Sequence, residues 1–118
     1  MCGIAGTVGY DPALLSGMLN RLQHRGPDNS GSARIPGAQC ALGHTRLSII
    51  DLDPRSHQPF VSPCRRYVMV FNGEIYNFAA LRQTLEQSGI RFQTTSDTEV
   101  LFHWLIQRGI AGLPELDG

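Results

Sequence analysis

The sequence predicts a layered α+β fold in which mostly antiparallel strands alternate with helices. Along the 118 residues, apolar residues recur at helical spacing in some segments, and short apolar runs bounded by glycine, proline or asparagine lie between them. A third observation is the dipeptide Asn72-Gly73 after the run Tyr-Val-Met-Val-Phe, the strongest short signal for a β-hairpin. A chain of this length normally forms one domain.

The first elements are a strand and a helix. Residues 1–9 predict a strand, and Asp11-Pro12 begins a helix because proline is favoured in the first helical turn. This helix should end within residues 24–26, and its apolar side is formed by Leu14, Leu15, Met18, Leu19 and Leu22. A turn at 25–28 then precedes a weak strand at 30–35.

A stronger strand is predicted at 39–50, followed by a loop at 51–63 that contains three prolines. Residues 67–71 read as a buried strand, and the return strand of the hairpin should begin at 74–76.

The C-terminal part predicts two helices. Asn77 can cap a helix that holds Leu81 and Leu85 and stops at Gly89, and residues 90–94 predict a short strand. The segment 96–99, Ser-Asp-Thr-Glu, has the pattern of a capping box. The helix that follows should bury Val100, Leu101, Trp104 and Leu105, end at Gly109, and lead into a further helical turn at 111–116.

Composition excludes several classes of protein. Hydrophobic residues make up 42% of the chain and the formal net charge is zero, which argues against disorder and against a nucleic-acid or membrane surface. No run reaches the ~18 apolar residues of a membrane span, and the N-terminus does not resemble a signal peptide. Three scattered cysteines fit a reducing compartment, so we expect a cytoplasmic protein. The cysteines and histidines lack the spacing of metal ligands, and no metal site is expected.

Cys2, directly after Met1, is the first candidate for chemistry. A small residue after methionine permits its removal, which would leave a terminal cysteine with a thiol nucleophile and a free α-amine as base. The alternative is a cysteine that lies near the start by chance. Cys40 is expected to be a core thiol and Cys64 an ordinary loop thiol. The alternative for Cys64 is that its basic neighbours lower its pKa.

Further candidates lie in polar clusters between the predicted elements. Asn72 and Gly73 offer hydrogen-bond donors for an oxyanion, although the pair can equally be only a turn. Arg46 can bind a carboxylate with two hydrogen bonds, or be an ordinary surface residue. Asp97 can receive an ammonium group or favour the helix dipole. Glu74 can meet a substrate amide or ammonium or be a solvated turn residue, and Arg25 and Asp28 are expected to pair and shape a loop.

Taken together, six segments resemble the class II glutamine amidotransferases, which are N-terminal-nucleophile hydrolases. They occur in the family's order over nearly the whole chain, at residues 1–6, 24–28, 43–51, 58–60, 71–77 and 95–100. Leu-Ser-Ile-Ile-Asp after Arg46, and Glu-Ile-Tyr-Asn after Gly73, are most similar to the glutaminase domain of glutamine-hydrolysing asparagine synthetases.

The resemblance implies a four-layer αββα sandwich of two antiparallel sheets and an enzyme that releases ammonia from glutamine. It implies that Cys2 is the nucleophile and that Asn72 and Gly73 form the oxyanion hole. Arg46 would bind the substrate carboxylate, and Asp97, with Gly73 and Glu74, its ammonium. The segment Leu47, Ser48, Ile49 and Ile50 would line the pocket.

Family members continue past the end of this sequence, so residues 1–118 are expected to be the N-terminal part of an amidotransferase domain, truncated and marginally stable alone. The partners implied are L-glutamine and a synthetase domain or subunit, with homo-oligomers also compatible. No cofactor is expected in this chain, because ATP and Mg²⁺ would bind in the absent synthetase domain. Two alternatives remain: a non-catalytic fragment that binds glutamine or a partner, and an amidotransferase with a different acceptor.

Overall fold

The computed structural model describes residues 1–9, 11–35, 37–48 and 53–118. It confirms the α+β class, with small antiparallel sheets and helices. The chain divides into two compact units, residues 1–52 with 57–72 and residues 53–56 with 73–118, which we describe separately. None of the helices in the described ranges is long and apolar enough to cross a membrane.

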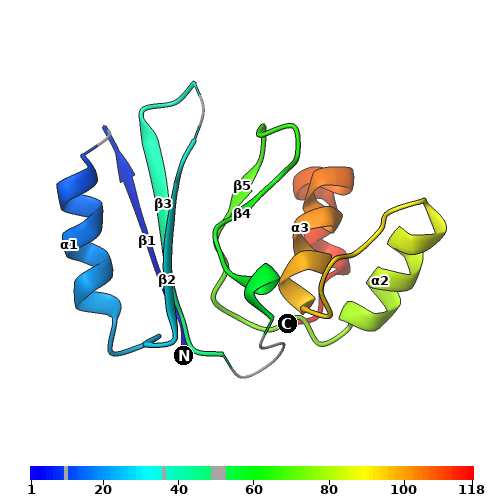
Figure 1. Cartoon of the computed structure of the whole chain (residues 1–118). Coiled ribbons are helices and arrows are strands. Elements are labelled where there is room, and N and C mark those ends of the chain that lie inside the picture. The colour runs from blue at the N-terminus through cyan, green and yellow to red at the C-terminus, as the bar shows by residue number, and fades with distance from the viewer. Residues whose placement is uncertain (10, 36, 49–52) are drawn as a thin grey trace. The chain divides into compact units, whose positions relative to one another are not determined.

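The first unit contains a three-stranded antiparallel sheet with the order β1-β3-β2 (Figure 1). These strands are β1 (Gly3–Val8), β2 (Asn29–Arg34) and β3 (Cys40–Arg46). The central strand β3 is shorter than the predicted 39–50. Its register pairs Gly3 with Thr45 and Ile4 with His44.

Helix α1 (Pro12–Leu22) covers one face of this sheet. The helix begins at the predicted Asp11-Pro12 start, and the Asp11 side chain caps it by accepting a hydrogen bond from Leu14 N. Leu15 and Leu19 pack with Ala41 in the core, whereas Leu14 remains 55% exposed, so the buried stripe is narrower than the apolar spacing suggests.

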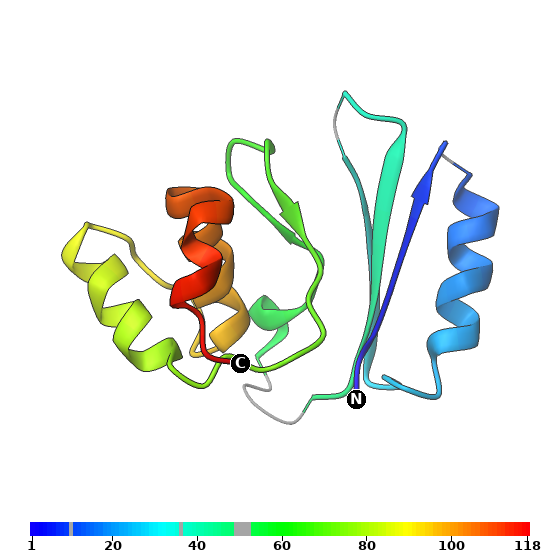
Figure 2. The same ribbon diagram turned by 180° about the vertical axis from the view of Figure 1, so that it is seen from behind.

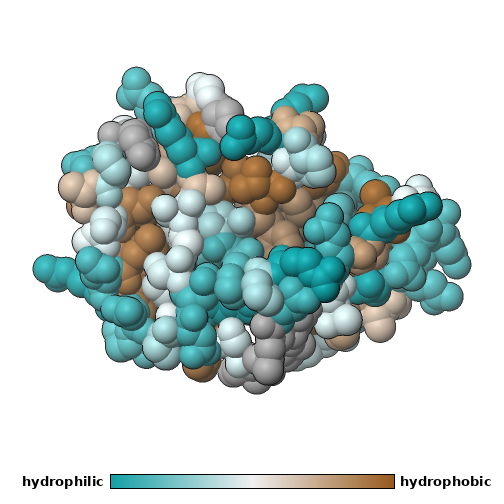
Figure 3. All heavy atoms as spheres, viewed as in Figure 1, coloured by the Kyte–Doolittle hydropathy of each residue, from teal (hydrophilic) through white to brown (hydrophobic). Residues whose placement is uncertain are grey.

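A short hairpin forms the second sheet of this unit, from β4 (Phe60–Val61) and β5 (Val68–Met69). The prediction of a loop throughout 51–63 is therefore wrong, since this segment holds β4 and also the 3₁₀ turn η1 (Pro54–Ser56). Figures 1 and 2 show the hairpin on the side of the three-stranded sheet opposite α1. Apolar side chains gather over the hairpin in Figure 3, where Val61 is 43% exposed.

The predicted hairpin at Asn72-Gly73 does not form. Strand β5, which precedes Asn72-Gly73, pairs with β4, which comes earlier in the chain, and residues 74–76 do not form a strand. The main-chain groups that a return strand would use have other partners: Ile75 N donates to Asp97 Oδ2, and Tyr76 N donates to the Asp117 carbonyl. Competition for backbone hydrogen bonds thus overrides the local turn signal.

The second unit is built on helices α2 (Phe78–Gln87) and α3 (Asp97–Arg108) and the 3₁₀ helix η2 (Gly109–Glu115). Its buried apolar residues are Ile75, Leu81, Leu85, Val100, Leu101, Phe102 and Trp104. Leu105, predicted to be buried, is only half-buried, and Phe102 is buried instead. Asn77 precedes α2, but its side chain bonds residues 115 and 117 rather than capping the helix.

The predicted strand at 90–94 is absent, because a buried carboxylate takes its main-chain groups. Glu99 accepts hydrogen bonds from Gln93 N at 3.0 Å and from Thr94 N at 2.7 Å. Ser96 caps α3 by accepting from Thr98 N, the second residue of the helix, while Ser96 N donates to Thr94 Oγ1 at 3.2 Å. The helix is capped, but not by the reciprocal bonds between Ser96 and Glu99 of the predicted capping box.

Candidate functional site

Cys2 lies immediately before β1, next to the residue that follows β3. Leu47 N donates a hydrogen bond to the Cys2 sulfur at 3.4 Å, and the Leu47 carbonyl oxygen lies 3.8 Å from the same atom. The thiol is half-buried. The two main-chain contacts with Leu47 hold the sulfur at this end of the sheet. While Met1 is attached, the nitrogen of Cys2 is an amide and cannot serve as a base.

The turn at residues 25–28 supports this end of the sheet. Arg25 Nε donates to the Cys2 carbonyl at 3.1 Å, while Ser48 N donates to Asp28 Oδ2 at 2.7 Å. The expectation that Arg25 and Asp28 pair with each other is wrong, since each bonds the main chain of a site segment instead. Gly26 permits the close approach, because a Cβ there would lie 2.5 Å from the Thr45 carbonyl.

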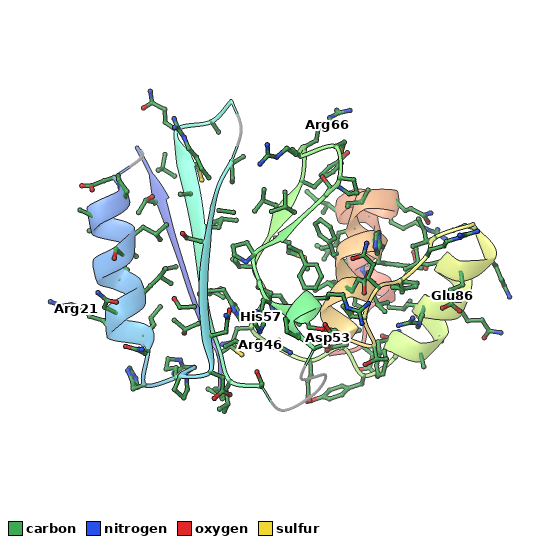
Figure 4. The ribbon with its side chains drawn as sticks, in the orientation of Figure 1. Arg21, Arg46, Asp53, His57, Arg66 and Glu86 are labelled. Atoms are coloured by element: carbon green, nitrogen blue, oxygen red, sulfur yellow. The ribbon has the colours of Figure 1, made fainter. Side chains whose placement is uncertain are left out.

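Arg46 is the last residue of β3 and is 6% exposed, which rules out the interpretation as a surface arginine. Figure 4 shows its side chain on the side of the sheet away from α1. A buried guanidinium is costly unless it serves a partner or a ligand, and its planar fork matches a carboxylate. The first unit therefore holds a cation close to the cysteine.

Sequence reasoning missed His44, two residues before Arg46 and hence on the same face of β3. Its ring is fully buried, and neither ring nitrogen has a hydrogen-bond partner. Burial lowers the pKa of His44 to about 4, the nearby main chain of Phe71 opposes the shift, and the charge of Arg46 adds to it. The imidazole is therefore neutral at pH 7. The sequence placed His44 in a polar cluster with Arg46, and that position was the signal that could have found it.

The other cysteines lie outside this arrangement. Cys40 is half-buried at the opposite end of β3, so the expectation of a core thiol is only partly met. Cys64 is exposed near the tip of the β4–β5 hairpin, where Figure 4 labels its neighbour Arg66. A hydrogen bond with the Ser62 hydroxyl is the main cause that lowers the pKa of the Cys64 thiol, and the main chain of Arg66 is the second cause. Within the described ranges no group of three or more His, Cys, Asp or Glu side chains is arranged to hold a metal ion.

Asn72 is exposed and is the last residue of the first unit. Gly73 and Glu74 are also exposed and are the first residues of the long segment of the second unit. In that unit the Asp97 carboxylate, at the start of α3, accepts a hydrogen bond from Ile75 N at 2.9 Å. Asp97 is thus tied to the main chain two residues after Gly73. This places Asp97 beside the segment that carries Gly73 and Glu74.

The predicted site residues therefore form two groups. The first unit brings together Cys2, Arg46, Leu47 and Ser48 at one end of its sheet. The second connects Asp97 with the segment after Gly73. Ile49 and Ile50 lie outside the described residues. A thiol with a main-chain donor, close to a buried arginine, can attack a carbonyl carbon of an anionic substrate.

Comparisons with known proteins show which proteins this chain is similar to. The family model of the glutamine amidotransferase domain matches residues 1–118. Glutamine-hydrolyzing asparagine synthetase 1 of Bacillus subtilis (strain 168) is 39% identical over 109 residues, covering 86% of this chain and 17% of that protein. A putative glutamine-hydrolyzing asparagine synthetase of Mycobacterium bovis is 43% identical over 115 residues, covering 86% of this chain and 18% of that protein.

Glutamine-hydrolyzing asparagine synthetase 2 of Oryza sativa subsp. japonica is 38% identical over 125 aligned residues, which include all of this chain and 20% of that protein. This chain therefore spans about a fifth of the length of these relatives. The match of the family model over every residue confirms the resemblance in the sequence, and the chain belongs to the class II glutamine amidotransferase family.

Proposed function

We propose that this domain hydrolyses the side-chain amide of glutamine, with Cys2 as the nucleophile. The observation that carries the proposal is the Cys2 thiol, which receives the Leu47 N–H beside the buried Arg46. Once Met1 is removed, the α-amine of Cys2 accepts the thiol proton and sulfur attacks the amide carbon. The tetrahedral intermediate collapses to a thioester as the nitrogen takes that proton and leaves as ammonia. Water then cleaves the thioester and releases glutamate.

The remaining roles follow the chemistry of each side chain. We propose that Arg46 binds the glutamine carboxylate and that the Asn72 side chain and the Gly73 N–H bind the oxyanion. Asp97, with Gly73 and Glu74, receives the α-ammonium. The segment Leu47 to Ile50 lines the pocket, with Leu47 holding the thiol through its main chain.

We further propose that the ammonia serves asparagine formation. The relatives are named glutamine-hydrolyzing asparagine synthetases, and this chain covers about a fifth of their length. A synthetase domain or subunit would then use ATP and Mg²⁺ to activate aspartate for attack by ammonia, and the present domain would supply that ammonia.

The test is a glutaminase assay on protein that begins at Cys2. We expect ammonia and glutamate in equal amounts, and a thioester adduct on Cys2 by mass spectrometry after rapid acid quench. Cys2→Ala should abolish turnover and keep glutamine binding, while Cys64→Ala, at an exposed thiol in the hairpin, should change neither. Glutamine binding without any turnover in the native protein would favour a binding domain over an enzyme.

A further inference from the structure

The side chain of Gln58 makes two hydrogen bonds to a single residue. Gln58 is 8% exposed; its Nε2 donates to the Phe71 carbonyl at 3.1 Å, and Phe71 N donates to its Oε1 at 2.6 Å. The carboxamide thus satisfies both main-chain polar groups of Phe71, as a neighbouring strand would. The next residue in the chain is Asn72.

The main chain of Gln58 is held against the sheet that begins beside Cys2. A Cβ on Gly31 of β2 would lie 2.4 Å from the Gln58 carbonyl oxygen, so only glycine permits this approach. Gly31 pairs with His44 of β3, and His44 pairs with Ile4 of β1.

Phe71 is also close to this sheet, since its main chain influences the buried ring of His44. A continuous set of contacts therefore runs from the strands through Gln58 to Phe71. All of these residues belong to the first unit.

We propose that Gln58 is a positioning residue that fixes the main chain of Asn72 relative to the sheet beside Cys2. The inference rests on the proposed function, in which the Asn72 side chain donates to the oxyanion. Gln58 does not touch the reacting atoms in this scheme. It acts because an oxyanion donor is effective only in a narrow range of positions, and a displacement of ~1 Å costs about a hundredfold in rate.

The first experiment compares Gln58→Met, which keeps the length of the side chain and removes both hydrogen bonds, with Gln58→Glu, which keeps the acceptor for Phe71 N. We expect Gln58→Met to lower kcat by about tenfold to a hundredfold and to change KM by less than about threefold. Gln58→Glu should have a smaller effect on kcat. An unchanged kcat in Gln58→Met would overturn the inference.

Ser62→Ala is the matched control. The Ser62 hydroxyl is 4% exposed and accepts a hydrogen bond from Tyr67 N at 3.1 Å in the same hairpin, but it makes no bond to Phe71. Its loss weakens the hairpin without releasing Asn72, so kcat should remain near the native value. An equal loss of kcat in Ser62→Ala and Gln58→Met would show that the effect is general destabilisation.

A double-mutant cycle with Asn72→Ala separates positioning from a merely structural role. If Gln58 acts through Asn72, adding Gln58→Met to Asn72→Ala should lower kcat by less than about twofold further. A multiplicative loss in the double variant would contradict the inference. If Gln58→Met melts below the assay temperature, Gln58→Glu is used in the same cycle.

Failure of the inference can be distinguished from failure of the proposed function. A native protein without glutaminase activity, or an Asn72→Ala variant with native kcat, refutes the proposed function or the role of Asn72. A slow Asn72→Ala beside a fully active Gln58→Met refutes only the positioning role. Amide hydrogen exchange at Phe71 adds a readout that does not depend on turnover. Gln58→Met should accelerate this exchange at least tenfold. An unchanged exchange rate would show that the Gln58 side chain does not hold the main chain of Phe71.

Discussion

The neutral, buried His44 should make the stability of the first unit fall as the pH is lowered. Its pKa is about 4 in the folded protein, against 6.5 for an accessible imidazole. Between these values the unfolded chain binds a proton that the folded chain excludes, so acid favours unfolding. Well above pH 6.5 the ring is neutral in both states and contributes no pH dependence.

The size of this effect follows from the shift. A difference of about 2.5 between the two pKa values, at 1.36 kcal/mol for each pH unit, amounts to about 3 kcal/mol, most of it lost between pH 6.5 and 4.5.

Glu99 makes the stability depend on pH in a lower pH range. Burial opposes its ionisation. The His103 ring, whose Nε2 lies 3.7 Å from Glu99 Oε1, and hydrogen bonds from Thr94 and Gln93 N outweigh burial and lower the pKa of Glu99 from 4.5 to about 2. Its stabilisation is present above pH 4.5 and is lost as the pH falls toward 2.

The assay is urea unfolding at pH 7.5, 6.5, 5.5 and 4.5, followed by far-ultraviolet circular dichroism. Trp104 fluorescence alone is unsuitable because this residue lies in the second unit. The leucine of His44→Leu cannot titrate. Between pH 7.5 and 4.5 the free energy of unfolding of the native protein should therefore fall by about 2 to 3 kcal/mol more than that of His44→Leu. His24→Gln, at an exposed histidine, is the control and should follow the native curve. Parallel curves for the native protein and His44→Leu would refute the burial of a neutral ring.

Three further predictions concern the cysteine and its supports. Protein that retains Met1 should show no glutaminase activity, because Cys2 then lacks a free amine; N-terminal mass spectrometry with the assay checks this, and full activity with Met1 present would contradict the mechanism. Asn72→Ala should lower kcat about a hundredfold with little change in KM, whereas Arg46→Ala should mainly raise KM; steady-state kinetics decides, and a rise in KM alone for both would disprove the oxyanion role. Gly26→Ala should destabilise the protein by about 2 to 4 kcal/mol, since its Cβ would meet the Thr45 main chain at 2.5 Å; an unchanged urea midpoint would show that the turn can move aside.

Local signals predicted the elements that depend on their own residues. Asp11 caps α1 and Gly89 follows α2 with φ of 93°, because a cap or a left-handed glycine needs only its neighbours in the chain. The resemblance likewise identified Cys2 and Arg46, which the structure brings to one end of the sheet.

The elements that sequence reasoning missed depend on distant partners. The Asn72-Gly73 hairpin fails because distant side chains take the main-chain groups that a hairpin needs. Gln58 lies thirteen residues before its partner Phe71, and Asp97 lies twenty-two residues after its partner Ile75. The same reason applies to residues 90–94, where a carboxylate replaces a neighbouring strand. Long-range hydrogen bonds of this kind leave no periodic pattern in the sequence.

The contact between Leu47 and Cys2 uses only the main chain of Leu47. A peptide N–H is present in every residue except proline, so the side chain at position 47 can change without loss of the hydrogen bond to the Cys2 sulfur. In the proposed function, the lining of the pocket and the hydrogen bond to sulfur are therefore separable at this position: new side chains can alter which substrate fits while the sulfur keeps its donor. If Cys2 is the nucleophile we propose, specificity can diversify at a residue that contacts it without loss of this hydrogen bond.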